Sequence, residues 1–270
     1  MADISRLSLN QATMQHWSVQ MAVEGCVRHG IPSIALWRDK IACTGLKECV
    51  KLVRDANLHV SSVCRGGMFP ASSVEERRRR VEDNFRAVDE AAALDADSLV
   101  IVVGAAPEVP IMEARAMVAD GLAEVAVYAR KCAVRLGLEP LHPMYAADRS
   151  VLNTIEQALQ ITSAYPKDEV GVILDAFHIW WDPYVFESIG KCAGRIFGFH
   201  VCDWLVPLPN HLLGRGMMGD GVIDIHMLRS AVDDAGFSGL IEVEIFNQEI
   251  WDSDGDEVLS RIIERFWKFV

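Results

Sequence analysis

The stretch "GVILDAFHIWW", residues 171–181, places two polar side chains at the end of an apolar run. Val172, Ile173 and Leu174 are typical of a strand that is buried on both faces. Asp175 follows directly, with no basic residue near it in the sequence, and His178 comes three positions later. A carboxylate at the end of a buried strand is costly unless it is paired or holds a cation. The stretch therefore predicts a buried strand that carries a functional group at its end.

The rest of the chain alternates similar short apolar runs with longer amphipathic stretches. Helical spacing is clearest at 18–30, which ends on Gly30, and at 72–95, which opens with the Ser-x-x-Glu pattern of a capping box. Residues 117–137 and 224–236 show the same period. Eight strand–helix alternations predict an α/β fold, a single (β/α)8 TIM barrel that forms one domain over residues 1–270. The predicted strands are 6–11, 33–37, 59–64, 98–104, 135–141, 170–177, 196–203 and 239–246.

An open doubly wound sheet is the structural alternative. It usually carries a G-x-G-x-x-G turn after an early strand, and none follows an early strand here. The sequence also lacks linkers, low-complexity tracts and repeats of solenoid period. The closed barrel is therefore favoured.

Composition limits the partners and the compartment. Against 26 basic side chains stand 38 acidic ones, a net charge of −12, so nucleic acid is not an expected partner. The one basic run, 75–83, is flanked by acids and predicts a solvated helix face. No apolar run approaches the roughly 20 residues of a membrane span, and the first residues do not resemble a signal peptide. The seven scattered cysteines favour reduced thiols, and a cytoplasmic protein is expected.

The last four predicted strands each end on a metal-capable side chain. In (β/α)8 barrels the C-terminal ends of the strands form the active site. One such acid alone more often caps a helix or pairs with a base, but four in succession predict a shared divalent cation. Three carboxylates and one imidazole suit Mn²⁺, with Mg²⁺, Co²⁺ and Zn²⁺ as alternatives. The predicted ligands are Glu139, Asp175, His200 and one of the two glutamates of the last strand, Glu242 or Glu244, which share one side of that strand and which spacing does not separate. Cys202 lies on the same side of its strand as His200 and is an alternative thiolate ligand.

Aromatic side chains gather near the same predicted strand ends. Their faces suit the C–H faces of sugars and cyclitols, but tryptophans in loops equally pack the rim of a barrel. Both interpretations stay open at this point. The residues concerned are Trp37, Phe177, Trp180, Trp181, Trp204 and Trp251.

These motifs resemble those of the xylose-isomerase-like sugar isomerase and epimerase superfamily. The resemblance covers nearly the whole chain, is strongest from the fifth strand onward, and is closest to ketohexose 3-epimerases and inosose isomerases or dehydratases. The strings that carry it are "GLEPLHP", "VILDAFHIWWD", "FGFHVCDW", "GRGMMGDGVIDI" and "IEVEIFNQEIW".

The resemblance implies roles for individual residues. Glu139, Asp175, His200 and Glu244 would bind one divalent metal, and the two glutamates would also form the acid/base pair. The resemblance implies that His178 and Arg215 contact the substrate. His142, which stands where the family pattern departs, and Trp181, one of the aromatic residues near the strand ends, complete the predicted substrate-binding residues. One departure argues against a free hexulose as substrate: where the epimerases have another acid after the strand-five glutamate, this chain has His142 and Tyr145.

The implied activity is epimerisation or isomerisation of a keto-sugar or cyclitol through a metal-stabilised cis-enediolate. The alternative is a dehydratase or lyase that acts on a keto-inositol, a dehydroshikimate-like compound or a 3-keto-glycoside. The resemblance also leans toward a homo-dimer or homo-tetramer. An endonuclease of the apurinic type would need histidines at the ends of strands three and four and a D-x-H after strand seven, but these strands end in "VCRGG", "VVGAA" and "CDW". A non-catalytic sugar-binding barrel is disfavoured, because a site that no longer catalyses a reaction would be expected to lose some of its metal ligands.

Overall fold

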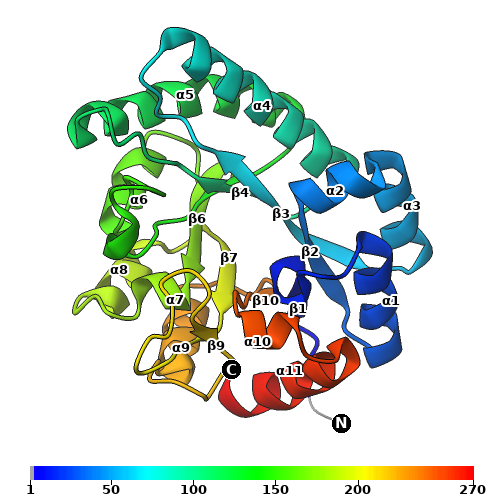
Figure 1. Cartoon of the computed structure of the whole chain (residues 1–270). Helices are drawn as coiled ribbons and strands as arrows, with labels where there is room; N and C mark the ends of the chain where they lie inside the picture. Colours follow the sequence, from blue (N-terminus) through cyan, green and yellow to red (C-terminus); the bar gives the residue numbers. More distant parts are fainter. Residues whose placement is uncertain (1–2) are drawn as a thin grey trace.

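Eight parallel strands pair into a closed barrel, and the helices surround it (Figure 1). The computed structural model describes residues 3–270. Around the barrel the order is β1-β10-β7-β6-β5-β4-β3-β2, so the last strand closes against the first. The strands are β1 (Leu7–Asn10), β2 (Ser33–Trp37), β3 (His59–Gly67), β4 (Leu99–Val102), β5 (Leu136–Leu138), β6 (Val170–Asp175), β7 (Ile196–Val201) and β10 (Ile241–Val243).

The helices begin and end at capping residues that the sequence supplies. The Ser18 hydroxyl accepts a hydrogen bond from the Met21 N–H at the start of α1, and Gly30 ends it at φ 67°. The helices are α1 (Val19–His29), α2 (Arg38–Thr44), α3 (Leu46–Asp55), α4 (Val74–Ala93), α5 (Ile111–Lys131), α6 (Ile155–Thr162), α7 (Ala176–Ile179), α8 (Val185–Lys191), α9 (Ile225–Asp234), α10 (Gln248–Trp251) and α11 (Gly255–Phe269), with the 3-10 turns η1 (Gln11–Met14) and η2 (Pro143–Tyr145).

All eight predicted strands and the barrel architecture are confirmed, but some boundaries were wrong. β5 ends at Leu138, well before the predicted 141, because Pro140 has no N–H for a ladder. α5 spans Ile111–Lys131, whereas the period suggested 117–137. The structure also contains an unforeseen antiparallel hairpin, β8 (Asp203–Trp204) with β9 (Arg215–Gly216).

The register of the barrel brings the polar strand ends together. Asp175 on β6 is the partner of His200 on β7, and His200 is in turn the partner of Glu242 on β10. Glycine allows the layer beneath them to pack closely: a Cβ on Gly137 would lie 2.5 Å from the Cδ1 of Ile173. One isoleucine therefore fills space that side chains on β5 and β7 would otherwise take.

The outer surface is polar. The basic run on α4 is indeed a solvated helix face, since Arg77, Arg78, Arg79 and Arg80 all pair with nearby acids. α4 and α5 lie side by side at the top of Figure 1. Among residues 3–270, no helix combines the length and apolar character that crossing a membrane requires.

Candidate metal centre and active site

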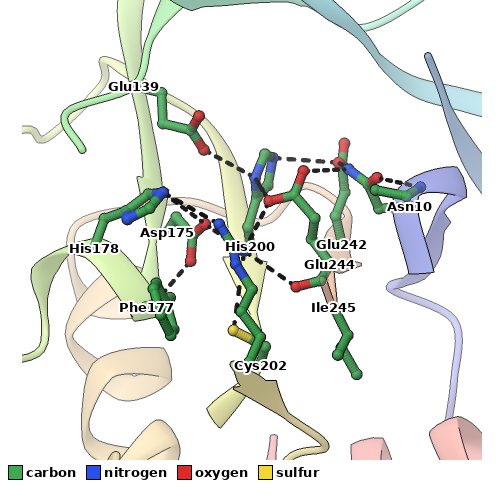
Figure 2. A network of polar contacts seen from close by, with 12 residues as sticks. Asn10, Glu139, Asp175, Phe177, His178, His200, Cys202, Glu242, Glu244 and Ile245 are labelled. Carbon is green, nitrogen blue, oxygen red and sulfur yellow. Dashed lines mark hydrogen bonds and ion pairs between the residues drawn. The ribbon is translucent and has the colours of Figure 1, made fainter. Parts of the chain in front are cut away.

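Four buried side chains converge at the C-terminal end of the barrel. Glu139 follows β5, Asp175 ends β6, His200 lies on β7 and Glu244 follows β10. One nitrogen or oxygen atom from each lies within 4.8 Å of those of the other three. Figure 2 shows the group around His200, with Glu139 and Asp175 on one side and Glu244 on the other. All four predicted ligands are thus brought together.

Two of the four side chains in this group carry atoms that have no hydrogen-bond partner among the described residues. The Nδ1 atom of His200 lies 3.2 Å from Oε1 of Glu139 and 3.8 Å from Oε2 of Glu244. Yet Glu139 Oε1 and both ring nitrogens of His200 are unsatisfied within residues 3–270. Buried polar atoms are normally paired, so an orphaned carboxylate oxygen beside an orphaned imidazole indicates a missing common partner. The donor set fits a hard divalent cation.

Asp175 also has a partner that its local sequence does not reveal. Its Oδ1 accepts a hydrogen bond from the Phe177 N–H at 2.8 Å and so caps α7. Its Oδ2 accepts one from Nη1 of Arg215 at 2.8 Å. Arg215 lies 40 residues further along the chain, on β9, and the pairing of β8 with β9 places its guanidinium beside Asp175. Asp175 therefore holds a helix start and a guanidinium, with room in the cluster for a metal ion.

Arg215 ties two of the carboxylates together. Besides Asp175, its Nη1 donates to Oε2 and to the main-chain oxygen of Glu244, at 2.9 and 3.1 Å, and Nη2 lies 3.2 Å from Nε2 of His178. Its charge also rests over the rings of Phe177 and Phe246. Arg215 is buried, so water screens its attraction to these carboxylates only weakly. Its side chain also lines the cavity.

Burial and charge act in opposite directions on the two acids. Burial raises the pKa of Asp175 to about 7, and the charge of Arg215 only partly offsets this. Burial would also raise the pKa of Glu244, but Arg215 and His200 together lower it to about 2. For His200, burial lowers the pKa, but the carboxylates of Glu242, Glu139 and Glu244 raise it well above its ordinary value. The excess of negative charge around the imidazole is what a divalent cation would neutralise.

The structure separates Glu242 from Glu244, which the sequence left together. Glu244 joins the four-residue cluster, whereas Glu242 lies one layer deeper in the barrel. Its Oε1 accepts from the Ser61 hydroxyl at 2.8 Å and its Oε2 from Nδ2 of Asn10 at 2.8 Å. The same Oε2 lies 3.2 Å from Nε2 of His200. Glu242 thus faces the ring edge that points away from Glu139 and Glu244, which is where a second carboxylate orients a metal-binding histidine.

Asn10 connects this buried network to the rim. Its amide donates to Glu242 and, at 3.1 Å, to Oε1 of Glu244, and its Oδ1 accepts from Nε1 of Trp37 at 2.8 Å. Ser8 continues the chain of contacts, 2.7 Å from the Ser61 hydroxyl. Asn10 and Ser61 were not among the predicted site residues. The one feature of the sequence that could have indicated them is a polar side chain within a buried strand, on β1 and on β3.

A cavity of about 360 Å³ opens above the cluster. Glu139, Glu244, His178 and Arg215 contribute to its walls, as do Trp37 and Tyr145. Its size lies near the lower end of the range for small-molecule sites, about 300–1,000 Å³. The cavity wall thus includes two of the four predicted ligands, Glu139 and Glu244, and two of the four predicted substrate-binding residues.

The other two predicted substrate-binding residues lie beside the cavity, not on its wall. The ring of His142 packs against Trp181 and Trp204, at 5.6 and 5.0 Å between centroids. Trp181 donates from Nε1 to the main-chain oxygen of His178 at 2.8 Å. Burial lowers the pKa of His142 to about 4. These side chains support the loops around the cavity.

Two further polar groups near the cluster have structural partners. Asp203 accepts hydrogen bonds from the N–H groups of Trp204, Gly219 and Ile223, and so shapes the β8–β9 region. Cys202, the alternative thiolate ligand, is buried, and burial raises its pKa well above the ordinary value. Its sulfur lies 4.0 Å from Nη1 of Arg215 and outside the four-residue cluster.

Comparison with known proteins adds to this geometry. The model of the xylose isomerase-like TIM barrel family matches residues 23–266. The chain belongs to this family. The resemblance drawn from the sequence motifs is thereby confirmed.

Individual relatives match across almost the full chain. Inosose isomerase from Bacillus velezensis is 24% identical, with 94% of this chain and 93% of that protein covered. Protein SMc04130 from Sinorhizobium meliloti 1021 has the same structure with a TM-score of 0.96 and 44% identity over 99% of both chains. A crystal structure of the IolI protein with a bound zinc atom superposes with a TM-score of 0.85 at 21% identity, covering 98% of both chains, which shows the shared fold.

Proposed function

We propose that this protein is a divalent-metal-dependent isomerase or epimerase of a keto-sugar or cyclitol. The observation that carries the proposal is the buried cluster of three carboxylates and one imidazole, two of which, Glu139 and Glu244, line a cavity of sugar size. The similarity to inosose isomerase supports a hydroxy-ketone of the cyclitol type as substrate. The zinc atom bound by IolI supports a metal in a barrel of this fold.

The ligands of the metal would be Glu139, Asp175, His200 and Glu244. Their oxygen-rich set favours Mn²⁺, with Mg²⁺, Co²⁺ and Zn²⁺ as alternatives. When bound, the ion would supply a Lewis acid that polarises the substrate carbonyl and so acidifies the adjacent C–H. Asp175 and Arg215 also fix the carboxylate of Glu244 in place, through the shared guanidinium.

The acid/base work would fall to Glu139 and Glu244. Glu244 is held as a carboxylate by Arg215 and Asn10 and can accept a proton. Glu139 has a carboxylate oxygen without a partner among the described residues, free to give or take one. One glutamate removes the proton beside the carbonyl, and an enediolate results. The other returns a proton to the opposite face for epimerisation, or to the neighbouring carbon for isomerisation.

Substrate oxygens would meet His178 and Arg215, which both line the cavity. Burial lowers the pKa of His178 well below its ordinary value, so the imidazole is neutral and can donate or accept a hydrogen bond. His142 and Trp181 would contact a substrate only where it extends beyond this cavity. Contact with His142 and Trp181 would therefore require a substrate larger than the cavity itself.

Two measurements on the purified protein test the proposal. Elemental analysis should find about one Mn, Co, Mg or Zn per chain, lost in Asp175→Ala. Proton NMR in D₂O should then show exchange at the carbon beside the carbonyl of an inosose or keto-sugar.

Each alternative gives a different result. A product lighter by one water would identify the lyase, and close to three zinc ions per chain would point to a nuclease. No metal after reconstitution, with no exchange, would refute the proposal.

A further inference from the structure

Two arginines at the rim of the cavity form no ion pair with any of the residues that the structure describes. Arg65 lies at the end of β3 and Arg149 in the loop after η2, and both are half-buried. They line the same cavity as Glu139 and Glu244. Arg215, deeper in the cavity, pairs with two carboxylates. Within residues 3–270, by contrast, Arg65 contacts the Met68 sulfur at 3.0 Å and Arg149 lies over the Tyr145 ring, and neither forms an ion pair.

The main chain that presents Arg65 is firmly held. The buried amide of Asn84 accepts a hydrogen bond from the Gly67 N–H at 2.6 Å and donates to the Gly67 oxygen at 2.8 Å. Gly67 has φ 103°, and a Cβ there would lie 2.0 Å from the Val102 oxygen. Only glycine fits this position. The strand end that carries Arg65 is therefore a fixed support, not a loose loop.

Arg149 is presented from a second anchored segment. Its N–H donates to the Tyr145 oxygen at 3.0 Å, and its guanidinium lies 5.6 Å from the centre of the Tyr145 ring. The next residue, Ser150, bridges to Gly104 after β4. Asp148 is the one acidic side chain at this part of the rim, and it is exposed to solvent. The carboxylate of Glu244 at the cavity is thus paired with Arg215, whereas Arg65 and Arg149 bring positive charge to the rim and form no ion pair within residues 3–270.

We propose that Arg65 and Arg149 bind an anionic group of the substrate, a carboxylate or a phosphate, at the end remote from the hydroxy-ketone. The inference rests on the proposed function and narrows its substrate to an acidic keto-sugar or cyclitol derivative. A guanidinium presents a planar fork of donors that matches both anions. A half-buried cation without a counter-ion costs free energy, and the bound anion removes that cost. The overall charge of −12 makes local attraction of an anion dependent on these two residues.

Dissociation constants for three hydroxy-ketone probes test the subsite. D-fructose is neutral, D-fructose 6-phosphate carries a phosphate and 5-keto-D-gluconate carries a carboxylate. Calorimetry on the metal-loaded wild type should give a dissociation constant for at least one anionic probe that is about 10-fold or more below that of fructose. Arg65→Gln and Arg149→Gln should each reduce this preference, and the double variant should abolish it. Arg261→Gln, which removes an exposed charge far from the cavity, should keep it.

The outcomes separate the sources of the anion and the two proposals. Preference for only the phosphate or only the carboxylate probe identifies which group is bound. No preference in the wild type, or a preference that survives in the double variant, overturns the subsite. Deuterium exchange on the same probes is scored separately. Anion preference without exchange on any probe would leave the subsite standing and count against the isomerase, while exchange on fructose without anion preference would do the reverse.

Discussion

The two halves of the barrel contribute different chemistry to one cavity. Strands β5, β6, β7 and β10 end in the groups that face its centre, Glu139, Asp175, His200 and Glu244. Strands β1 to β4 supply none of these. They contribute Asn10 and Ser61, which hold Glu242 and Glu244 by hydrogen bonds, Trp37, which donates to Asn10, and Arg65 on the rim.

The two halves of the barrel therefore serve different roles: one supplies the predicted metal ligands, and the other supports them. In the second half, Glu139 and His200 leave buried atoms without a hydrogen-bond partner among the described residues, as a binding group does before its ligand arrives. In the first half, Ser8, Asn10, Ser61 and Trp37 form a hydrogen-bonded network that supports Glu242. Substitutions in the second half should therefore remove chemistry, and those in the supporting network should weaken it by degrees.

The largest effect is expected for the two glutamates of the second half. Glu139→Gln and Glu244→Gln should each slow deuterium exchange by about 10³-fold, within the range of a lost acid or base. Circular dichroism should show a folded barrel in both. Glu249→Gln, on an exposed side chain just beyond β10, is the matched control and should exchange at the wild-type rate. Near-normal turnover in both variants would end the acid/base assignment.

Arg215 should matter for stability as well as for binding. In Arg215→Met, the buried carboxylates of Asp175 and Glu244 lose their shared guanidinium. The metal-free variant should lose about 3–5 kcal/mol in free energy of unfolding, measured in urea. Added metal should restore part of this, because it supplies positive charge at the same carboxylates. Equal stability of variant and wild type without metal would show that these carboxylates are protonated or hydrated instead.

Glu242 offers the sharpest test of the support role. Glu242→Gln keeps the shape of the side chain but removes the charge that faces Nε2 of His200. Metal affinity should fall about 10- to 100-fold, as for other partners of metal-binding histidines, while the number of sites stays at one. Competition with a chelator of known affinity measures it. If affinity falls as far as in Asp175→Ala, Glu242 is itself a ligand and the division between the halves fails.

The smallest effect concerns pH. Burial lowers the pKa of folded His142 to about 4, below the roughly 6.5 of an unfolded histidine. As pH falls from about 6.5 toward 4, the unfolded chain takes up this proton first, so the group costs stability. Because the imidazole is only half-buried, the loss should stay under about 1 kcal/mol. Urea titrations of His142→Asn should show a shallower decline than the wild type, and His211→Asn, on an exposed residue, should not.

Much of the fold and the four-residue cluster could be predicted from the sequence, for a physical reason. Buried parallel strands are continuous apolar runs, so Val172, Ile173 and Leu174 mark their strand, and an acid at its end is conspicuous. The barrel then brings successive strand ends to one face. Contacts between distant segments had no such signal. The pairing of Asp175 with Arg215 depends on the β8–β9 hairpin, whose strands have two residues each.

Position along a strand was also beyond the sequence. Glu242 and Glu244 share one side of β10, and only the register against His200 assigns one to the deeper layer. The placement of His142 and Trp181 beside the cavity follows from how the His142 ring packs against Trp181 and Trp204, which depends on the shape of three loops. These details are set by tertiary packing, which periodicity does not encode.

The pairing of β10 with both β1 and β7 has a consequence for how the protein is made. Glu244 reaches the other three ligands only when the last strand docks between the first strand and the seventh. Until then, β1 and β7 expose open edges, which are prone to pair with other chains. Closure joins residues more than 200 positions apart, as in Leu7 with Ile241, so it is a late and slow step of folding. The full ligand set therefore forms only when the barrel closes, so metal capture and closure of the barrel are coupled.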